Sequence, residues 1–238
     1  MEVCLFLIGQ GDDGSRALSD SDVSSIYSTS REVDRLRRLV VHRRLEPASG
    51  DPTLDAPLIA PPCVLQWYFD DLDALESALQ RGGAIQSVLD GWSYAAQGYP
   101  MFAQQVMAVR TFATPNADVS GQSSERCTYL VSYEGEAPDF NAWLTHYMTH
   151  HPPLMAQLPG IRELEIYTRV DYRSGLAVQR AAAMQRNKVV FDHPSALSAA
   201  LASPVRVRMK HDFDAFPPYS GIAPHYPMHS IYGNLPGR

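Results

Sequence analysis

Alternating and helix-spaced apolar residues divide the chain into strands and helices. Runs rich in β-branched and aromatic residues predict strands at 3–8, 39–45, 64–69, 100–112, 126–131, 161–171 and from His225 onward. Apolar residues three and four positions apart predict helices at 20–36, 70–80, 84–97, 140–151 and 191–201. Two stretches rich in Pro, Gly, Ser and Asp predict a long loop at 47–62 and a linker at 114–125.

The pattern of the first half of the chain returns in the second half. The aligned pairs of segments are 3–8 with 126–131, 69–79 with 191–201, and Tyr-Pro-Met at 99–101 with 226–228. Their offsets of 123, 122 and 127 are nearly constant, so we interpret the chain as a duplication of one unit. The predicted units are residues 1–113 and 126–238, joined by a linker over 114–125.

Each unit reads strand, helix, strand, strand, helix, strand, which is the order of a ferredoxin-like βαββαβ fold. A four-stranded sheet with helices on one face leaves its other face bare. Two such sheets can bury their bare faces against each other. The sequence therefore predicts an α+β fold in which two tandem ferredoxin-like repeats form a barrel with the helices outside.

Four motifs in the second half carry a resemblance to a known family. They are His-Tyr-Met-Thr-His-His-Pro-Pro-Leu at 146–154, Leu-Pro-Gly-Ile-Arg at 158–162, Phe-Asp-His-Pro-Ser-Ala-Leu-Ser-Ala-Ala-Leu-Ala-Ser-Pro at 191–204, and His-Asp-Phe-Asp-Ala-Phe at 211–216. In these motifs the second half resembles the EthD-type branch of the dimeric α+β barrel proteins. The first half departs from this pattern, because its first helix has no histidine and no Pro-Leu ending. The resemblance implies that the second repeat keeps the family's site, while the first repeat is a divergent scaffold that supplies the opposite wall. The sequence also suggests a homodimer that forms through an exposed sheet edge or helix face.

Three histidines gather at the end of the predicted helix at 140–151, just before two prolines that should stop or kink it. His146 and His150 are four residues apart and therefore share a helix face, and His151 follows them. A metal site is one alternative, with a third ligand from His211, His225, His229 or Glu165, but the HExxH motif is absent and we assign no metal. Another is that imidazoles near a helix C-terminus gain from the helix dipole and need no ligand.

The strand at 161–171 alternates between two sets of side chains. Glu163, Glu165, Tyr167 and Arg169 share the face that we expect to line the barrel lumen. The equivalent face of the first sheet carries Val40, His42 and Arg44. We predict a small-molecule pocket there. The alternative is a closed barrel in which these residues lie at a solvated strand end.

These patterns lead to a functional hypothesis. The predicted catalytic residues are His146, His150, His151 and Tyr167, and the predicted substrate-binding residues are Arg44, His42, Glu165, Arg169, His225 and His229. Members of the superfamily that the chain resembles include enzymes that work without a cofactor by acid–base chemistry. We therefore expect a cofactor-independent lyase of the decarboxylase type that acts on a small phenolic or aromatic acid in the lumen. The alternatives are an isomerase or polyketide-cyclase-type enzyme, a metal-dependent enzyme, and a non-catalytic small-molecule-binding or stress-response protein.

Composition narrows the remaining classes. A hydrophobic content of 45% and a charged content of 19% are ordinary for a globular protein. The net charge of −6 argues against a nucleic-acid partner. No apolar run is long enough to span a membrane, and three scattered cysteines fit a reducing compartment, so we expect a cytoplasmic protein. Two groups of side chains are predicted to pack in the core: Trp67, Tyr68, Trp92 and Tyr94, and, around the second helix, Asp212, Phe213, Phe216 and Tyr219.

Overall fold

The computed structural model of the protein describes residues 1–11, 17–45, 60–90, 101–115, 117 and 125–233. Most of the predicted loop at 47–62, the end of the helix predicted at 84–97 and most of the predicted linker at 114–125 lie outside these residues. Trp92 and Tyr94 lie outside them as well.

Ten strands and six helices form the described fold. The first half of the chain contains β1 (Val3–Gln10), α1 (Asp20–Ser30), β2 (Leu36–Arg44), β3 (Cys63–Phe69), α2 (Leu72–Ala78), α3 (Ala84–Asp90) and β4 (Met101–Phe112). The second half contains β5 (Glu125–Glu136), α4 (Phe140–Met155), β6 (Glu163–Arg169), β7 (Gln179–Arg180), β8 (Gln185–Phe191), α5 (Pro194–Leu201), α6 (Pro204–Asp214), β9 (Ser220–Ile222) and β10 (His225–Tyr232).

Eight of these strands close into an antiparallel barrel. Their order is β1-β3-β2-β10-β5-β8-β6-β4, and β4 pairs again with β1. The first half supplies β4-β1-β3-β2 and the second half supplies β10-β5-β8-β6, so that β2–β10 and β4–β6 are the two seams. The predicted α+β barrel is therefore confirmed. The origin of the two halves by duplication stays a prediction.

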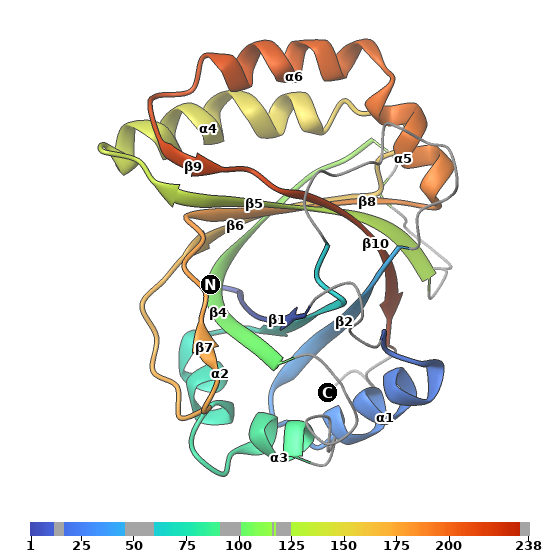
Figure 1. Cartoon of the computed structure of the whole chain (residues 1–238), viewed down its shortest axis with the longest axis vertical. Coiled ribbons are helices and arrows are strands. Elements are labelled where there is room, and N and C mark those ends of the chain that lie inside the picture. The colour runs from blue at the N-terminus through green and yellow to red at the C-terminus, as the bar shows by residue number, and fades with distance from the viewer. Residues whose placement is uncertain (12–16, 46–59, 91–100, 116, 118–124, 234–238) are drawn as a thin grey trace.

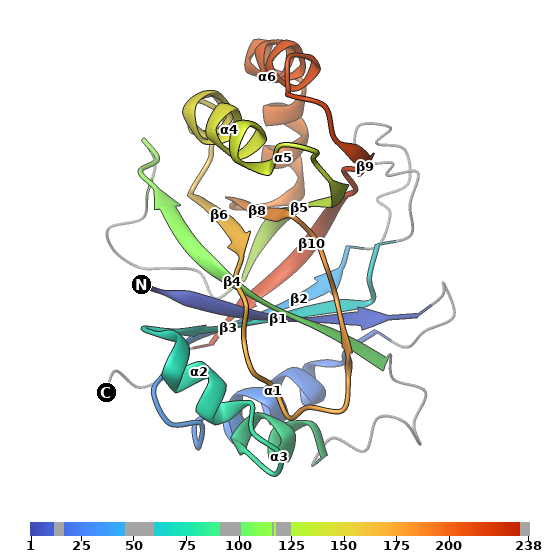
Figure 2. The ribbon, with the colours of Figure 1, turned by 90° about the vertical axis from the view of Figure 1, so that its left-hand side faces the viewer.

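The helices cover the barrel from two opposite sides. Helices α1, α2 and α3 lie against the strands of the first half, and α4, α5 and α6 lie against those of the second half (Figures 1 and 2). Each sheet therefore has one face toward its own helices and one face toward the barrel lumen. None of the described helices is both long and apolar enough to cross a membrane.

Short polar signals fix where the helices begin. Ser19 and Asp22 form a reciprocal capping box at the start of α1. Asp139 caps α4, because its Oδ1 accepts a hydrogen bond of 2.8 Å from the amide of Ala142.

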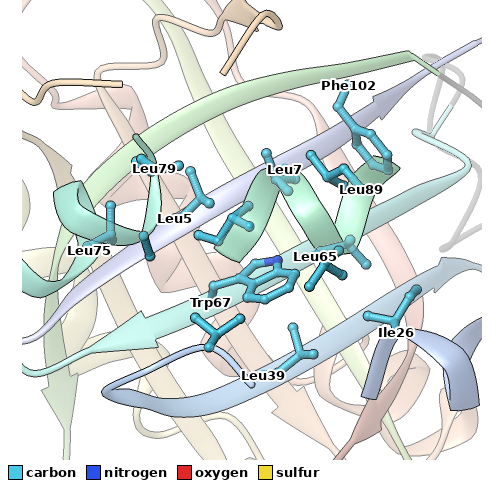
Figure 3. Close-up of a cluster of buried hydrophobic side chains, with 14 of the residues drawn as sticks. Leu5, Leu7, Ile26, Leu39, Leu65, Trp67, Leu75, Leu79, Leu89 and Phe102 are labelled. Carbon is cyan, nitrogen blue, oxygen red and sulfur yellow. The ribbon is translucent and has the colours of Figure 1, made fainter. Parts of the chain in front are cut away.

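The core between the first sheet and its helices is built around Trp67 (Figure 3). Trp67 is fully buried among leucines of β1, β2, β3 and α2, including Leu5, Leu39 and Leu75. Truncating such a side chain to alanine costs about 3–5 kcal/mol, because the cavity that it leaves closes only in part. This half therefore has the packing of a scaffold, and the prediction that Trp67 is a core residue is confirmed.

The helices of the second half differ from those expected in two ways. Helix α4 does not stop at Pro152 and Pro153 but runs through both to Met155. The prolines occupy its last turn, where their fixed φ fits a helix, and the amide of Ala156 still donates to the carbonyl of Pro152 at 2.9 Å. The second helix of the second half is also followed by a separate helix, α6, which the apolar spacing did not reveal.

Candidate active site

Helix α4 presents its aromatic and imidazole side chains on two different faces. Trp143, Tyr147, His151 and Met155 recur every four residues, and all four are buried toward the sheet. His146 and His150 lie together on a neighbouring face, with ring centroids 4.6 Å apart, as the spacing predicted. The structure thus separates His151, which points inward, from His150, which is exposed.

Asp212 of α6 lies between α4 and α6 and holds two of these histidines. Its Oδ2 is 2.7 Å from Nδ1 of His151, and its Oδ1 is 3.2 Å from Nε2 of His146. Asp212 was predicted to be a packing residue, so this is a correction: its carboxylate is a hydrogen-bond acceptor for both imidazoles. Phe216 and Tyr219 do pack as predicted, against Trp143 and Tyr133.

A cavity of about 200 Å³ lies between the second sheet and helices α4, α5 and α6. Its walls are mostly apolar and aromatic: Tyr129, Val131, Tyr133, Met155, Leu158, Val189, Phe191, Leu197, Leu201, Met209 and Phe213. Its polar lining comes from His151, Asn187, Arg206, Lys210 and His225. A concave apolar space with a few converging polar groups is the usual form of a small-molecule site.

Burial keeps the two histidines of this cavity neutral. Burial lowers the pKa of His151 below its ordinary value, and the hydrogen bond to Asp212 only partly opposes this shift. Burial and the nearby guanidinium of Arg206 lower the pKa of His225 to about 4. Because a carboxylate only accepts hydrogen bonds, Nδ1 of a neutral His151 carries the proton and donates it to Asp212. Nε2 of His151 is then left with a lone pair, which is the form of a general base.

Arg206 adds a positive charge to the cavity. It lies in the first turn of α6, and within the described residues its guanidinium has no hydrogen bond or ion pair. Its charge lowers the pKa of both His151 and His225. A guanidinium that lines an apolar cavity without a carboxylate partner suits the binding of an anionic ligand.

The barrel lumen contains a different cluster of polar side chains, centred on Glu165. Nζ of Lys188 is 2.8 Å from Oε2 of Glu165 and 3.0 Å from Oε2 of Glu163. A terminal nitrogen of Arg38 is 2.6 Å from Oε1 of Glu165. The hydroxyls of Tyr68 and Tyr167 also donate to Glu165. Since Lys188, Tyr68 and Tyr167 have no exposed surface, side chains fill the centre of the lumen.

Charge balance fixes the protonation of this lumen cluster. Burial alone would raise the pKa of Glu165, but Lys188 and Arg38 hold it well below its ordinary value. Burial and the adjacent carboxylate raise the pKa of the Tyr167 phenol far above its ordinary value. Glu165 is therefore ionised and Tyr167 is protonated, and both already have partners.

The predicted site residues fall into separate places. His42, Glu165 and Tyr167 lie in the lumen, as the strand alternation predicted, and His42 bonds to Gln66 at 2.6 Å and to Ser230 at 2.7 Å. His151 and His225 line the cavity on the opposite face of the sheet. His146 does not line this cavity but contacts Asp212, which in turn contacts His151.

His229 and Arg169 lie apart from both places, and Arg44 lies at the end of a strand. His229 is 3.4 Å from Glu125, and the guanidinium of Arg169 lies 4.9 Å over the ring of Phe140. Arg44 ends β2, opposite Met228 of β10. Among the residues that the structure describes, no three metal-binding side chains are grouped to hold an ion.

Sequence reasoning missed Asp212, Arg206 and Lys188. Lys188 is one of only two lysines in the chain and directly precedes the apolar residues Val189, Val190 and Phe191, which is a usable signal of a paired interior charge. Asp212 and Arg206 lie on the helix that was not predicted, so nothing in the apolar spacing placed them next to His151.

The fold is shared with solved structures of very different sequence. A monooxygenase candidate from Fusobacterium nucleatum is 8% identical with a TM-score of 0.54, and the match covers 97% of this chain and 92% of that chain. An anthrone oxidase-like protein is 12% identical with a TM-score of 0.51, and the match covers 98% and 93%. A match to an EthD-family protein from Bacillus halodurans is 16% identical and covers 46% of this chain and 97% of that chain, but its TM-score of 0.33 is too low to show a shared fold.

At such low identity the first two likenesses show the fold alone. No protein-family model matches the sequence, and no curated protein matches it. The chain is therefore assigned to the α+β barrel class, and its resemblance to the EthD-type branch stays a prediction.

Proposed function

We propose that the protein is an enzyme that moves a proton on a small aromatic anion bound in the cavity between the second sheet and α4, α5 and α6. The observation that carries this proposal is the contact between His151 and Asp212 in the wall of an otherwise apolar cavity. A base that a carboxylate orients, placed where water is largely excluded, is the arrangement that acid–base catalysis requires.

His151 is the proposed base. Its Nε2 takes a proton from a phenol or an acidic C–H of the substrate, and Asp212 stabilises the imidazolium that forms. Because burial lowers the pKa of His151, the ring is neutral and ready to accept a proton at pH 7. The earlier hypothesis that Tyr167 moves protons stays a prediction, and the observed contacts of Tyr167 favour His151 instead.

Arg206 is the proposed anion anchor. A guanidinium can hold a carboxylate or a phenolate through two parallel hydrogen bonds. The aromatic walls formed by Tyr129, Tyr133 and Phe213 suit a planar ring beside that anion. These features favour a phenolic or aromatic acid of one ring, which is the size that a cavity of about 200 Å³ accepts.

The reaction that we propose is a decarboxylation that the side chains can carry without a cofactor. For a phenolic acid with an unsaturated side chain, His151 takes the phenol proton while the side-chain carbon that bears the carboxylate takes up a proton from water. The resulting quinone methide accepts the electron pair of the breaking C–CO₂ bond, so CO₂ leaves and the phenolate returns. The imidazolium gives its proton back to the phenolate once CO₂ has left. An isomerase starts with the same proton abstraction but returns the proton to another atom of the substrate.

Product analysis tests this proposal. Purified, chelator-treated protein is incubated with phenolic acids, lactones and anthrone-type rings, and the products are measured by mass spectrometry. A mass loss of CO₂ supports the decarboxylase. A new retention time at constant mass supports an isomerase, and a mass gain of oxygen with O₂ consumed supports an oxidase like the one that the neighbour's name describes. Saturable binding without conversion, also with metal restored, would contradict the enzyme and favour a binding protein.

A further inference from the structure

Within the part of the chain that the structure describes, one buried arginine at an end of the barrel has no ion pair of the kind that Lys188 and Arg38 form. Arg186 lies on the lumen face of β8 and is only 9% exposed. Its Nε and one terminal nitrogen donate to Oε1 of Gln105, at 3.3 and 3.2 Å, and its guanidinium lies 5.5 Å over the ring of Phe6. Within the described residues no carboxylate lies within ion-pair distance of it.

The other interior cations show what this protein does with a buried charge. Lys188 and Arg38 each contact Glu165 within 2.8 Å. Leaving a buried charge without a partner costs several kcal/mol, because the charge has lost its hydration. Burial accordingly lowers the pKa of Arg186 to about 10. Among the described residues, the charge of Glu134 only partly opposes this shift and forms no ion pair with Arg186, so the guanidinium lacks a direct anionic partner.

Arg186 also borders an open space large enough for a ligand. A cavity of about 600 Å³ lies at this end of the barrel, lined by Arg186, Arg180, Glu134 and Tyr226 together with Ile8 and Ala103. Arg180 adds a second positive charge, and its guanidinium lies 4.1 Å over the ring of Tyr172. Glu134 supplies one negative charge, so these three charged groups sum to +1 and favour a singly charged anion.

We propose that this barrel mouth binds a small organic monocarboxylate, with its carboxylate on Arg186 and its apolar body against Ile8, Ala103 and Tyr226. The planar guanidinium matches a carboxylate through two hydrogen bonds. Ile8, Ala103 and Tyr226 offer an organic body apolar contacts that a bare inorganic anion cannot use, and Glu134 disfavours a doubly charged ligand.

The barrel mouth and the cavity of the proposed active site lie on opposite faces of the same strands. Three pairs of adjacent residues show this, because in each pair the first residue named lines the active-site cavity and the second lines the barrel mouth. The pairs are Tyr133 and Glu134 of β5, Asn187 and Arg186 of β8, and His225 and Tyr226 of β10. Since side chains alternate across a strand, the sheet separates the two anion sites. The proposal for the mouth therefore stands independently of the proposed function.

Calorimetric titration with benzoate at constant ionic strength tests the proposal. Four proteins are compared: the wild type, Arg186→Gln, Arg206→Gln and the double variant. Arg206→Gln removes the anchor of the other cavity, so any benzoate bound by this variant reports on the mouth. Adding Arg186→Gln should weaken that binding by about tenfold to a hundredfold, as expected for charge-assisted hydrogen bonds.

Equal benzoate binding by Arg206→Gln and the double variant, or no binding by either, would overturn the proposal. Binding that is lost in Arg206→Gln but kept in Arg186→Gln would place the anion in the other cavity only, and would also count against the mouth. Far-ultraviolet circular dichroism checks that each variant is folded. If Arg186→Gln does not fold, Arg186→Lys replaces it, because this variant keeps the positive charge but loses the planar guanidinium. Arg186→Lys should weaken benzoate binding several-fold, and an unchanged affinity would refute the role of Arg186.

Discussion

Replacing Lys188 by methionine should destabilise the protein strongly, although it exchanges a lysine for a more apolar side chain. Lys188 is fully buried in the lumen and contacts two carboxylates, Glu163 and Glu165, at 3.0 and 2.8 Å. Methionine fills most of the space but leaves these carboxylates with Arg38 as their cation. The lumen cluster then changes from charge balance to a net negative charge.

The magnitude follows from the burial of the pair. Breaking a buried ion pair by removing one partner costs about 3–5 kcal/mol. This is a large share of the roughly 5–15 kcal/mol by which domains are stable. Neutralising both partners, in Glu165→Gln with Lys188→Met, restores the balance between Arg38 and Glu163. We expect the double variant to be more stable than the sum of the two single changes by about 1–3 kcal/mol.

The pH dependence gives a second signature of the same charge. The folded-state pKa of Glu165 lies below its ordinary value of 4.5, so its ionised form stabilises the fold above that pH, and this contribution is lost as the pH falls. In Lys188→Met, protonation of Glu165 relieves the uncompensated charge. The stability difference between wild type and variant should therefore be largest at pH 7 and shrink at pH 4.

Urea unfolding, followed by tryptophan fluorescence at both pH values, measures these differences. A Lys188→Met protein within about 1 kcal/mol of the wild type at pH 7 would refute the account of the lumen, because the pair would then contribute no more than an exposed one. A difference that grows toward pH 4 would refute the assignment of the excess charge to Glu165.

Three further predictions concern the cavity. Asp212→Asn should lower kcat by about 10²–10⁴, because an amide can donate to Nδ1 of His151 and reverse its tautomer; a kcat within threefold of the wild type, with an unchanged pH profile, would argue against this positioning role. In the wild type, kcat/KM should rise with pH and level off with an apparent pKa below 6.5, since the base must be neutral and burial lowers its pKa; a midpoint above 6.5 would exclude His151. The pKa of His225 is about 4 in the folded protein and 6.5 ordinarily, so between these pH values only the unfolded chain binds the proton, and the folded state loses stability as the pH drops from 6.5 to 4. His225→Gln should therefore lose less stability over this pH range, as measured by urea unfolding. An equal loss in the wild type and the variant would contradict the assignment.

The sequence was sufficient to predict the barrel and one of its faces. Strand alternation placed Glu165 and Tyr167 in the lumen, together with His42 from the other half of the chain. The alternation of side chains along each strand could not show that Lys188 and Arg38 would pair with Glu165 and fill the lumen with a charge-balanced cluster. That outcome depends on distances between strands far apart in the chain.

The site was predicted only in part, for a related reason. The spacing of α4 put His151 four residues after Tyr147, on the buried face, but the sequence did not reveal that this face meets a cavity rather than solid core. His225 was predicted to bind the substrate, but the sequence did not show which side of the sheet it faces, and the strand pairing fixed this. The homodimer stays a prediction. Because each of the eight strands of the described barrel is paired on both sides, the outer faces of the helices are the candidate surfaces for contact between two copies of the chain.

The most direct test of the cavity as the active site compares two neighbouring histidines of α4. On whichever substrate the product analysis identifies, turnover is measured for His151→Ala and for His150→Ala, the second serving as a matched control because His150 is exposed and does not line the cavity. The account predicts that His151→Ala loses about 10²–10⁴ in kcat while His150→Ala stays within threefold of the wild type. A large loss in His150→Ala with activity kept in His151→Ala, or full activity in both variants, would contradict it.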